Sequence, residues 1–166
     1  MRLHFRSFCV ITVVMNFVER EHFAVVGIGA RTSNAREMAG EGEISRTWDR
    51  FMKEGLAEKI PHRADAGMVA VYSGYASDEH GEYDFLLGVK VSAVSEVPEG
   101  MVVRNVPTGR YAVFAAERGP AAKVVYEAWQ RIWAEPRTRE YTRSYRADFE
   151  VYGADGGVEI YVGVKG

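Results

Sequence analysis

Hydrophobic and polar positions alternate between two spacings along the chain. In the first half, residues 22–31 form an apolar strand, residues 35–42 are a loop of small and charged residues, and residues 43–56 carry apolar side chains at helical spacing. Residues 67–75 and 82–93 then return to strand patterns. The first half is therefore predicted to be a β-α-β-β unit.

The second half repeats this order. Residues 101–118 form an interrupted strand, a helix begins near Pro120 and ends at Pro136, and residues 144–152 and 158–165 are the last two strands. We predict an α+β fold in which duplicated β-α-β-β units form one antiparallel sheet. Two helices should cover one face of this sheet, and the other face should be open.

Short motifs support the duplication. Trp48-Asp-Arg-Phe51 and Tyr83-Asp-Phe-Leu-Leu-Gly-Val-Lys90 are echoed by Trp129-Gln-Arg-Ile132 and Val158-Glu-Ile-Tyr-Val-Gly-Val-Lys165. Two copies of one unit packed face to face leave a cleft along their shared axis, and such clefts bind small molecules. The sequence therefore predicts a ligand cleft between the repeats.

The length of the chain fits one domain. Its 166 residues are 47% hydrophobic and 27% charged, as in an ordinary globule with a buried core. We predict a single domain over residues 15–166, with pseudo-repeats 15–97 and 98–166, and an N-terminal extension over residues 1–14. The apolar run in this extension is short and lacks a small-x-small cleavage site, so a secretory signal is not favoured and we expect a cytoplasmic protein.

Charge and composition argue against several function classes. A net charge of −2 and the lack of a Lys/Arg run give no general attraction to nucleic acid, and no apolar segment reaches the length of a membrane span. The single Cys9 and four scattered histidines offer no metal-ligand spacing. Gly27-Ile-Gly29 is half of a dinucleotide fingerprint and lies inside a strand. We therefore expect no metal, no cofactor and no direct nucleic-acid contact.

Glu150 is the candidate site residue. Period two sends Phe149 and Val151 to the core under the helices and sends Asp148, Glu150 and Tyr152 to the opposite, open face. A charged residue on a solvated sheet face would be ordinary. However, the chain places many tyrosines in or beside its strands, namely Tyr72, Tyr75, Tyr83, Tyr111, Tyr145, Tyr152 and Tyr161.

A carboxylate enclosed by aromatic rings suits a flat, cationic ligand. The carboxylate loses hydration until an opposite charge arrives, and the ring faces attract that same cation. We predict that Glu150 supplies the charge and that the walls are Tyr72, Tyr75, Tyr83, Tyr152 and Trp133. Trp133 could equally belong to the core, and Trp48 and Trp129 are expected to be core residues. The arginines between Arg137 and Arg146 are expected to lie in a solvated loop before a strand.

The sequence also resembles a known family. The gyrase-inhibitor-like small-molecule-binding family shows similar motifs in the same order between about residues 17 and 165, namely Phe23-Ala-Val-Val-Gly-Ile-Gly29, Arg31-Thr-Ser-Asn34, Val71-Tyr-Ser-Gly-Tyr75, Tyr83-Asp-Phe-Leu-Leu-Gly88, Val106-Pro-Thr-Gly-Arg-Tyr-Ala-Val-Phe114, Ala128-Trp-Gln-Arg-Ile-Trp133 and Tyr145-Arg-Ala-Asp-Phe-Glu-Val-Tyr152. This family is similar to the effector-binding domains of AraC- and MerR-type multidrug-sensing transcription activators. The resemblance implies a duplicated, SHS2-like fold with a cleft between the halves, and Glu150 as the central cleft carboxylate.

Three functions follow from this resemblance. The first is binding of lipophilic aromatic or cationic compounds, for drug or toxin sequestration or effector sensing. The second is hydrolysis of cyclopropane-bearing DNA-alkylating compounds, with Glu150 as general base and a neighbouring tyrosine holding the departing oxygen. The third is interaction with a protein partner, such as gyrase or a transcription regulator, since the chain has no room for a helix-turn-helix DNA reader.

Overall fold

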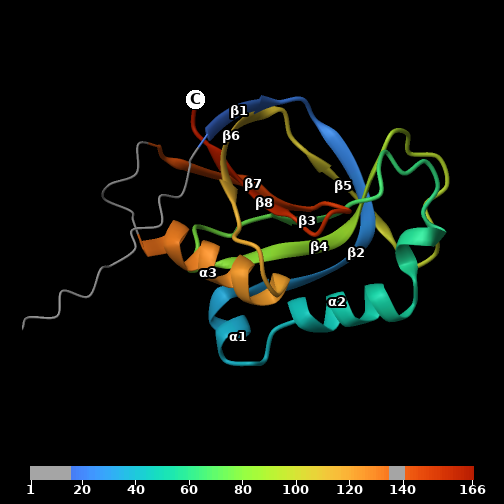
Figure 1. The fold of residues 1–166 in the computed structure, drawn as a ribbon, viewed down its shortest axis with the longest axis horizontal. Helices are drawn as coiled ribbons and strands as arrows, with labels where there is room; N and C mark the ends of the chain where they lie inside the picture. The colour runs from blue at the N-terminus through green and yellow to red at the C-terminus, as the bar shows by residue number, and fades with distance from the viewer. Residues whose placement is uncertain (1–15, 135–140) are drawn as a thin grey trace, which may run out of the picture.

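The fold is one eight-stranded antiparallel sheet with helices packed against it. The computed structural model describes residues 16–134 and 141–166, and the predicted extension 1–14 lies outside these described residues. The strands are ordered β1-β6-β8-β7-β3-β4-β2-β5 (Figure 1). Their bounds are β1 (Asn16–Arg20), β2 (Phe23–Ser33), β3 (Met68–Ser73), β4 (Glu82–Val91), β5 (Val102–Val106), β6 (Gly109–Ala115), β7 (Arg143–Tyr152) and β8 (Val158–Val164). The predicted α+β class is confirmed.

The strand order reads the same from both ends when β1 to β4 are exchanged for β5 to β8. The centre of the sheet is the pair β3 and β7, and each outermost strand pairs with a strand from the other half of the chain, because β1 pairs with β6 and β5 with β2. A duplicated unit with exchanged first strands would give this order. The duplication itself stays a prediction.

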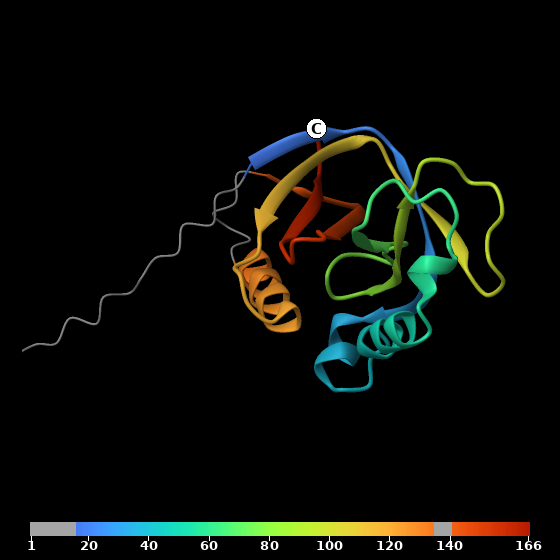
Figure 2. The ribbon, with the colours of Figure 1, turned by 45° about the vertical axis from the view of Figure 1, so that its right-hand side comes forward.

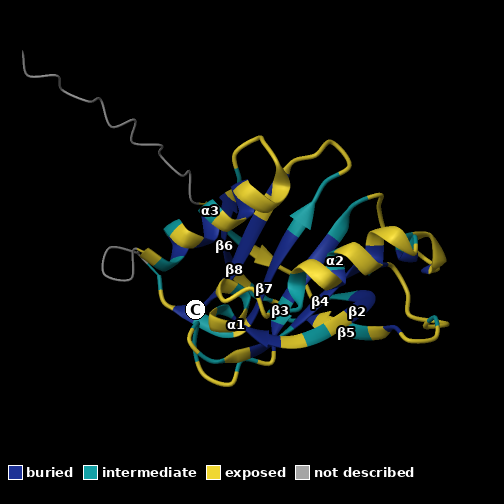
Figure 3. Cartoon of the chain, turned by 90° about the horizontal axis from the view of Figure 1, so that it is seen from below, coloured by how far each residue is buried: buried dark blue, intermediate teal, exposed yellow. Residues whose placement is uncertain are grey.

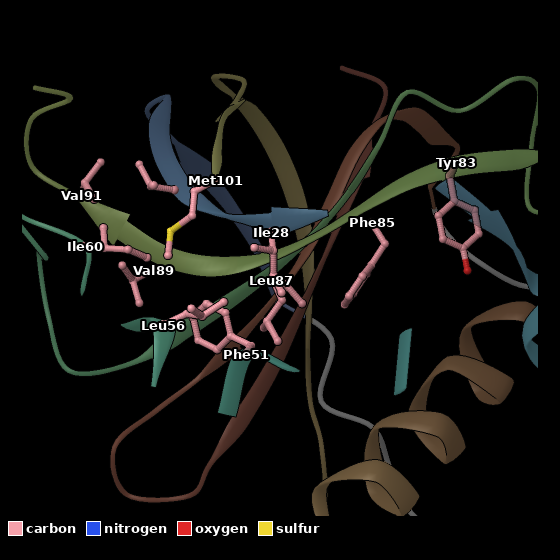
Figure 4. Packing of buried hydrophobic residues seen from close by; sticks show 12 residues of the cluster. Ile28, Phe51, Leu56, Ile60, Tyr83, Phe85, Leu87, Val89, Val91 and Met101 are labelled. Carbon is pink, nitrogen blue, oxygen red and sulfur yellow. The ribbon is translucent and has the colours of Figure 1, made fainter. Parts of the chain in front are cut away.

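Two helices, α2 (Ile44–Lys53) and α3 (Ala121–Ala134), lie on the same side of the sheet (Figures 1 and 2). Apolar side chains at helical spacing face the sheet, so Phe51 of α2 is 1% exposed and Ile132 of α3 is 3% exposed. Figure 4 shows the cluster beneath α2, where Phe51 and Leu56 pack against Ile28 and Leu87. A corresponding cluster lies beneath α3.

The predicted loop 35–42 contains a short helix, α1 (Asn34–Met38). Ser33 caps it by accepting a hydrogen bond from the Arg36 backbone N–H. The Glu37 carboxylate then accepts the backbone N–H groups of Glu43 and Ile44, at 2.7 and 3.3 Å, and so satisfies the start of α2. The prediction missed α1 because its capping serine belongs to the preceding strand. A 3₁₀ turn, η1 (Leu56–Lys59), follows α2.

The second face of the sheet is not open, which corrects the prediction. Strands from both ends of the sheet bring side chains into one buried cluster on this face, with Val25 of β2, Val113 of β6 and Phe149 of β7 among its members. The sheet therefore curves around its own side chains, as the arch of β1, β6 and β2 in Figure 1 shows. Figure 3 shows buried strands between helices whose outer surfaces are exposed. Both sheet faces are consequently core.

The close backbone approach of the paired strands β2 and β4 requires a glycine at position 27. Gly27 pairs with Gly88, and a methyl group built on Gly27 would lie 2.0 Å from the Leu87 carbonyl oxygen. We expect Gly27→Ala to lower the free energy of unfolding by about 1 to 3 kcal/mol, as overpacking does, measured by chemical denaturation. Gly109→Ala is the control, since its new methyl would meet nothing nearer than a Tyr111 ring carbon at 4.0 Å. Equal stability of both variants would contradict this account.

Candidate functional site

A cleft of about 820 Å³ opens on the helix-bearing face, lined by residues of α1, α2, α3 and the strands beneath them. Its wall is strongly aromatic. All three tryptophans of the chain take part, together with five of its nine tyrosines. These aromatic residues are Trp48, Trp129, Trp133, Tyr72, Tyr75, Tyr83, Tyr126 and Tyr152.

Glu150 lies at the centre of the sheet floor of this cleft. It belongs to β7 and faces Ala70 of β3 in register, and the small alanine leaves room for the carboxylate on the helix side. The side chain is 1% exposed. Its Oε1 accepts hydrogen bonds from the Tyr72 hydroxyl at 2.8 Å and the Trp129 indole N–H at 2.7 Å, and its Oε2 accepts one from the Tyr152 hydroxyl at 2.6 Å.

Within the described part of the chain, the Glu150 carboxylate has hydrogen-bond donors but no cationic partner. None of the ion pairs within residues 16–134 and 141–166 involves this carboxylate. Burial raises the pKa of Glu150, although its three hydrogen-bond donors act in the opposite direction. Burial, and then the charge of Glu150, also raise the pKa of Tyr72 and of Tyr152, so both hydroxyls stay protonated and keep donating.

The other predicted wall residues line the same cleft without contacting Glu150 directly. The Tyr75 hydroxyl donates to Asp148 at 2.5 Å, and the Tyr83 hydroxyl donates to Asn34 at 2.9 Å. Trp133 stacks on Trp129 with ring centroids 5.9 Å apart. The structure therefore brings all six residues to one cleft, while their roles in ligand binding stay a prediction.

The face predicted for Glu150 is wrong. Alternation correctly separates Phe149 from Glu150, but Glu150 points toward the helices and Phe149 points into the cluster on the other face. Alternation along a strand shows which residues share a face of the sheet, but it does not show which face the helices cover. Since both faces of β7 are buried, the polarity of the strand gave no guide to the choice.

Two tryptophans expected in the core also form the cleft wall. Trp129 packs in the cluster under α3 and donates its indole N–H to Glu150. Trp48 of α2 packs edge-on against Tyr152 with centroids 4.7 Å apart. Helical spacing predicted correctly that both face the sheet. The error was to treat the core and the cleft wall as alternatives, because a large aromatic side chain can belong to both.

Arg143 lies in the cleft wall, and the solvated loop predicted for it is wrong. Arg143 is 4% exposed, lines the cleft and forms an ion pair with the fully buried Asp148, at 2.7 Å from Nη2 to Oδ2. An odd number of steps separates these residues, so regular alternation would put them on opposite faces. The register of β7 shifts between them, where Tyr145 has a left-handed backbone with φ of 53°. This irregularity turns Arg143 inward.

Within the described ranges, no three His, Cys, Asp or Glu side chains gather in a way that could hold a metal ion. No described helix has both the length and the apolar character needed to cross a membrane.

Known transcriptional regulators are similar to this chain in sequence. The putative transcriptional regulator protein YobU of Bacillus subtilis is 31% identical over 146 residues, which are 84% of this chain and 90% of that protein. The transcriptional regulator BrlR of Pseudomonas aeruginosa is 31% identical over 136 residues, and this match spans 81% of the chain but 46% of BrlR.

Solved structures share the fold. The integron cassette protein VCH_CASS2, from the mobile metagenome of Vibrio cholerae, superposes with a TM-score of 0.76 at 28% identity, over 91% of this chain and 95% of that one. SAV2435, solved bound to tetraphenylphosphonium, has a TM-score of 0.74 at 19% identity, over 92% and 94% of the two chains. The sequence profile described as "Cass2: Integron-associated effector binding protein" matches residues 16–164. The chain therefore belongs to the Cass2 family of integron-associated effector-binding proteins, which confirms the gyrase-inhibitor-like resemblance seen in its sequence.

Proposed function

We propose that this protein binds lipophilic aromatic cations in the cleft between α2 and α3, as an effector sensor or as a drug- or toxin-sequestering protein. The observation that carries the proposal is Glu150, a fully buried carboxylate with no cationic partner among the described residues. Burying an unpaired charge is costly, and a cation entering the cleft offsets that cost. Membership of an effector-binding family independently supports binding of a small molecule.

The charges and rings around Glu150 favour the same ligand class. Among the described residues, the cleft is lined by four carboxylates, from Glu37, Asp49, Glu79 and Glu150, and by one guanidinium, whose charge Asp148 already balances. Each ring face that meets a cation adds about 0.5 to 2 kcal/mol. The compound bound to SAV2435, a protein of the same fold, is itself a lipophilic aromatic cation. The cleft wall is therefore suited to select a ligand by its charge and shape more than by a fixed pattern of hydrogen bonds.

The hydrolase alternative fits the geometry less well. A general base needs a free lone pair within hydrogen-bond reach of a water molecule. Glu150 already accepts three hydrogen bonds from Tyr72, Trp129 and Tyr152. These donors act to lower the pKa of the carboxyl, so they weaken it as a base while leaving its negative charge available to a cation.

A matched pair of ligands tests the proposal. N-methylquinolinium and 1-methylnaphthalene have nearly the same shape, and only the first is charged. We expect the cation to bind at least about tenfold more tightly, because one ion pair with a desolvated carboxylate exceeds 1.4 kcal/mol. Calorimetry would give both affinities, and quenching of the three cleft tryptophans would show where the ligands bind. Equal affinities would contradict the proposed charge selectivity.

The affinity for the cation should depend on pH through Glu150. Burial raises the pKa of this carboxyl above 4.5, so it takes up a proton at a higher pH than an exposed glutamate does. The protonated form offers no charge to the cation. Below the raised pKa, we expect the affinity for N-methylquinolinium to fall about tenfold per pH unit. Calorimetric titrations across the acidic range would measure this slope, and 1-methylnaphthalene should show none.

A further inference from the structure

Arg143 has two donor nitrogens, Nε and Nη1, that no described residue accepts from. Its side chain is 2% exposed and lies in the cleft wall. Nη2 donates to Asp148, while Nε and Nη1 are buried and have no partner among the described residues. A buried, charged donor without an acceptor is destabilising, and native structures rarely keep one. The two free donors therefore indicate a missing acceptor.

Asp148 cannot provide that acceptor. Its Oδ1 accepts the Gly163 backbone N–H at 2.9 Å, and its Oδ2 accepts both the Tyr75 hydroxyl at 2.5 Å and Arg143 Nη2 at 2.7 Å. The carboxylate is thus engaged by three donors, and it binds the guanidinium through a single nitrogen. The pair balances the charge of Arg143 but leaves its hydrogen-bonding capacity unfilled.

We propose that the cleft contains an acceptor subsite at Arg143, which takes a neutral oxygen, such as a ketone carbonyl, of the same ligand whose cationic centre lies at Glu150. This inference rests on the proposed function and defines its substrate class more closely. A neutral oxygen is favoured over an anionic one because Asp148 already balances the arginine and Glu79 adds a further negative charge to this part of the wall.

The spacing between the two subsites follows from the strand. Asp148 and Glu150 are two residues apart on β7 and share a face, so their side chains are separated by roughly 7 Å. The Arg143 guanidinium lies beside Asp148, over the ring of Tyr145 at 4.5 Å and near the ring of Trp129 at 5.7 Å. Trp129 also donates to Glu150 and so links the two subsites. A rigid aromatic spacer between cation and oxygen would match this arrangement.

Two phosphonium ions that differ only in a carbonyl oxygen or a methylene at one position test the subsite. (4-Acetylphenyl)triphenylphosphonium carries a carbonyl oxygen one ring away from its charge, and (4-isopropenylphenyl)triphenylphosphonium replaces that oxygen by a methylene of nearly equal shape. We expect the acetyl compound to bind about ten- to a hundredfold more tightly by calorimetry, the effect of one hydrogen bond from a charged donor. Equal affinities would overturn the subsite and leave the proposed function standing. If neither ion binds, the proposed function fails as well.

A double variant assigns the preference to Arg143. Arg143→Met with Asp148→Asn removes both charges together, so no buried charge is left unpaired. The affinity ratio of the two phosphonium ions is expected to fall close to one in this variant, whatever its affinity for either ion alone. A ratio that persists would overturn the assignment. A crystal structure of the wild-type complex gives an independent readout: the carbonyl oxygen should lie within hydrogen-bond distance of Nε or Nη1, and an oxygen pointing elsewhere would overturn the subsite.

Discussion

Glu150→Gln is expected to weaken the binding of N-methylquinolinium at least about 30-fold at neutral pH, because removing one partner of a desolvated charge pair costs about 2 to 5 kcal/mol. The binding of 1-methylnaphthalene should change by less than about threefold, since it uses the rings and not the charge. Calorimetry on both variants with both ligands would measure the two changes separately.

The glutamine should preserve the shape of the site. Its amide oxygen can accept from Tyr72 and Trp129 as Oε1 does now, and its amide N–H groups can face the Tyr152 oxygen. Stability provides the control. Because burial raises the pKa of Glu150, the ionised carboxylate destabilises the folded state at pH values above that pKa. Glu150→Gln removes this charge and should therefore unfold at an equal or higher temperature. An equal loss of affinity for both ligands would contradict the role of the charge.

The fold was predictable because its signals are local. The helical stripe of α2 and the alternation of β3, β4, β7 and β8 place these elements within a few residues of their observed bounds. The α1 helix was not predictable to the same degree, because its five residues are stabilised by Ser33 and by contacts of Glu37 with the start of α2. The curvature that buries the second sheet face involves strands from both ends of the sheet, and no local pattern reports it.

The residue types of the candidate site were predictable from the sequence, but the sheet face on which the site lies was not. A carboxylate among many strand tyrosines indicated an aromatic cleft correctly, and Tyr72 and Tyr152 do contact Glu150. The choice of face needed tertiary information, because Phe149 and Glu150 are both buried. Arg143 was hidden because its inward position depends on an irregular register in β7, and period-two reasoning assumes a regular one.

Arg143→Met alone is expected to lower the free energy of unfolding by about 3 to 5 kcal/mol, because it leaves the buried carboxylate of Asp148 without its cation. Asp148 is fully buried and keeps only two neutral donors, Tyr75 and Gly163, in that variant. Chemical denaturation of the variant and the wild type would measure the loss.

The double variant Arg143→Met with Asp148→Asn separates charge pairing from packing. The asparagine keeps an oxygen for the Gly163 backbone N–H, and its amide N–H group can face the Tyr75 oxygen, so both polar contacts persist without a charge. Replacing a whole buried ion pair by neutral side chains is often nearly neutral for stability, whereas breaking the pair is not. We therefore expect the double variant to regain most of the stability lost by Arg143→Met. If it stays as unstable as the single variant, the contribution of Arg143 lies in the contacts of its guanidinium with the Trp129 and Tyr145 rings and not in its pairing with Asp148.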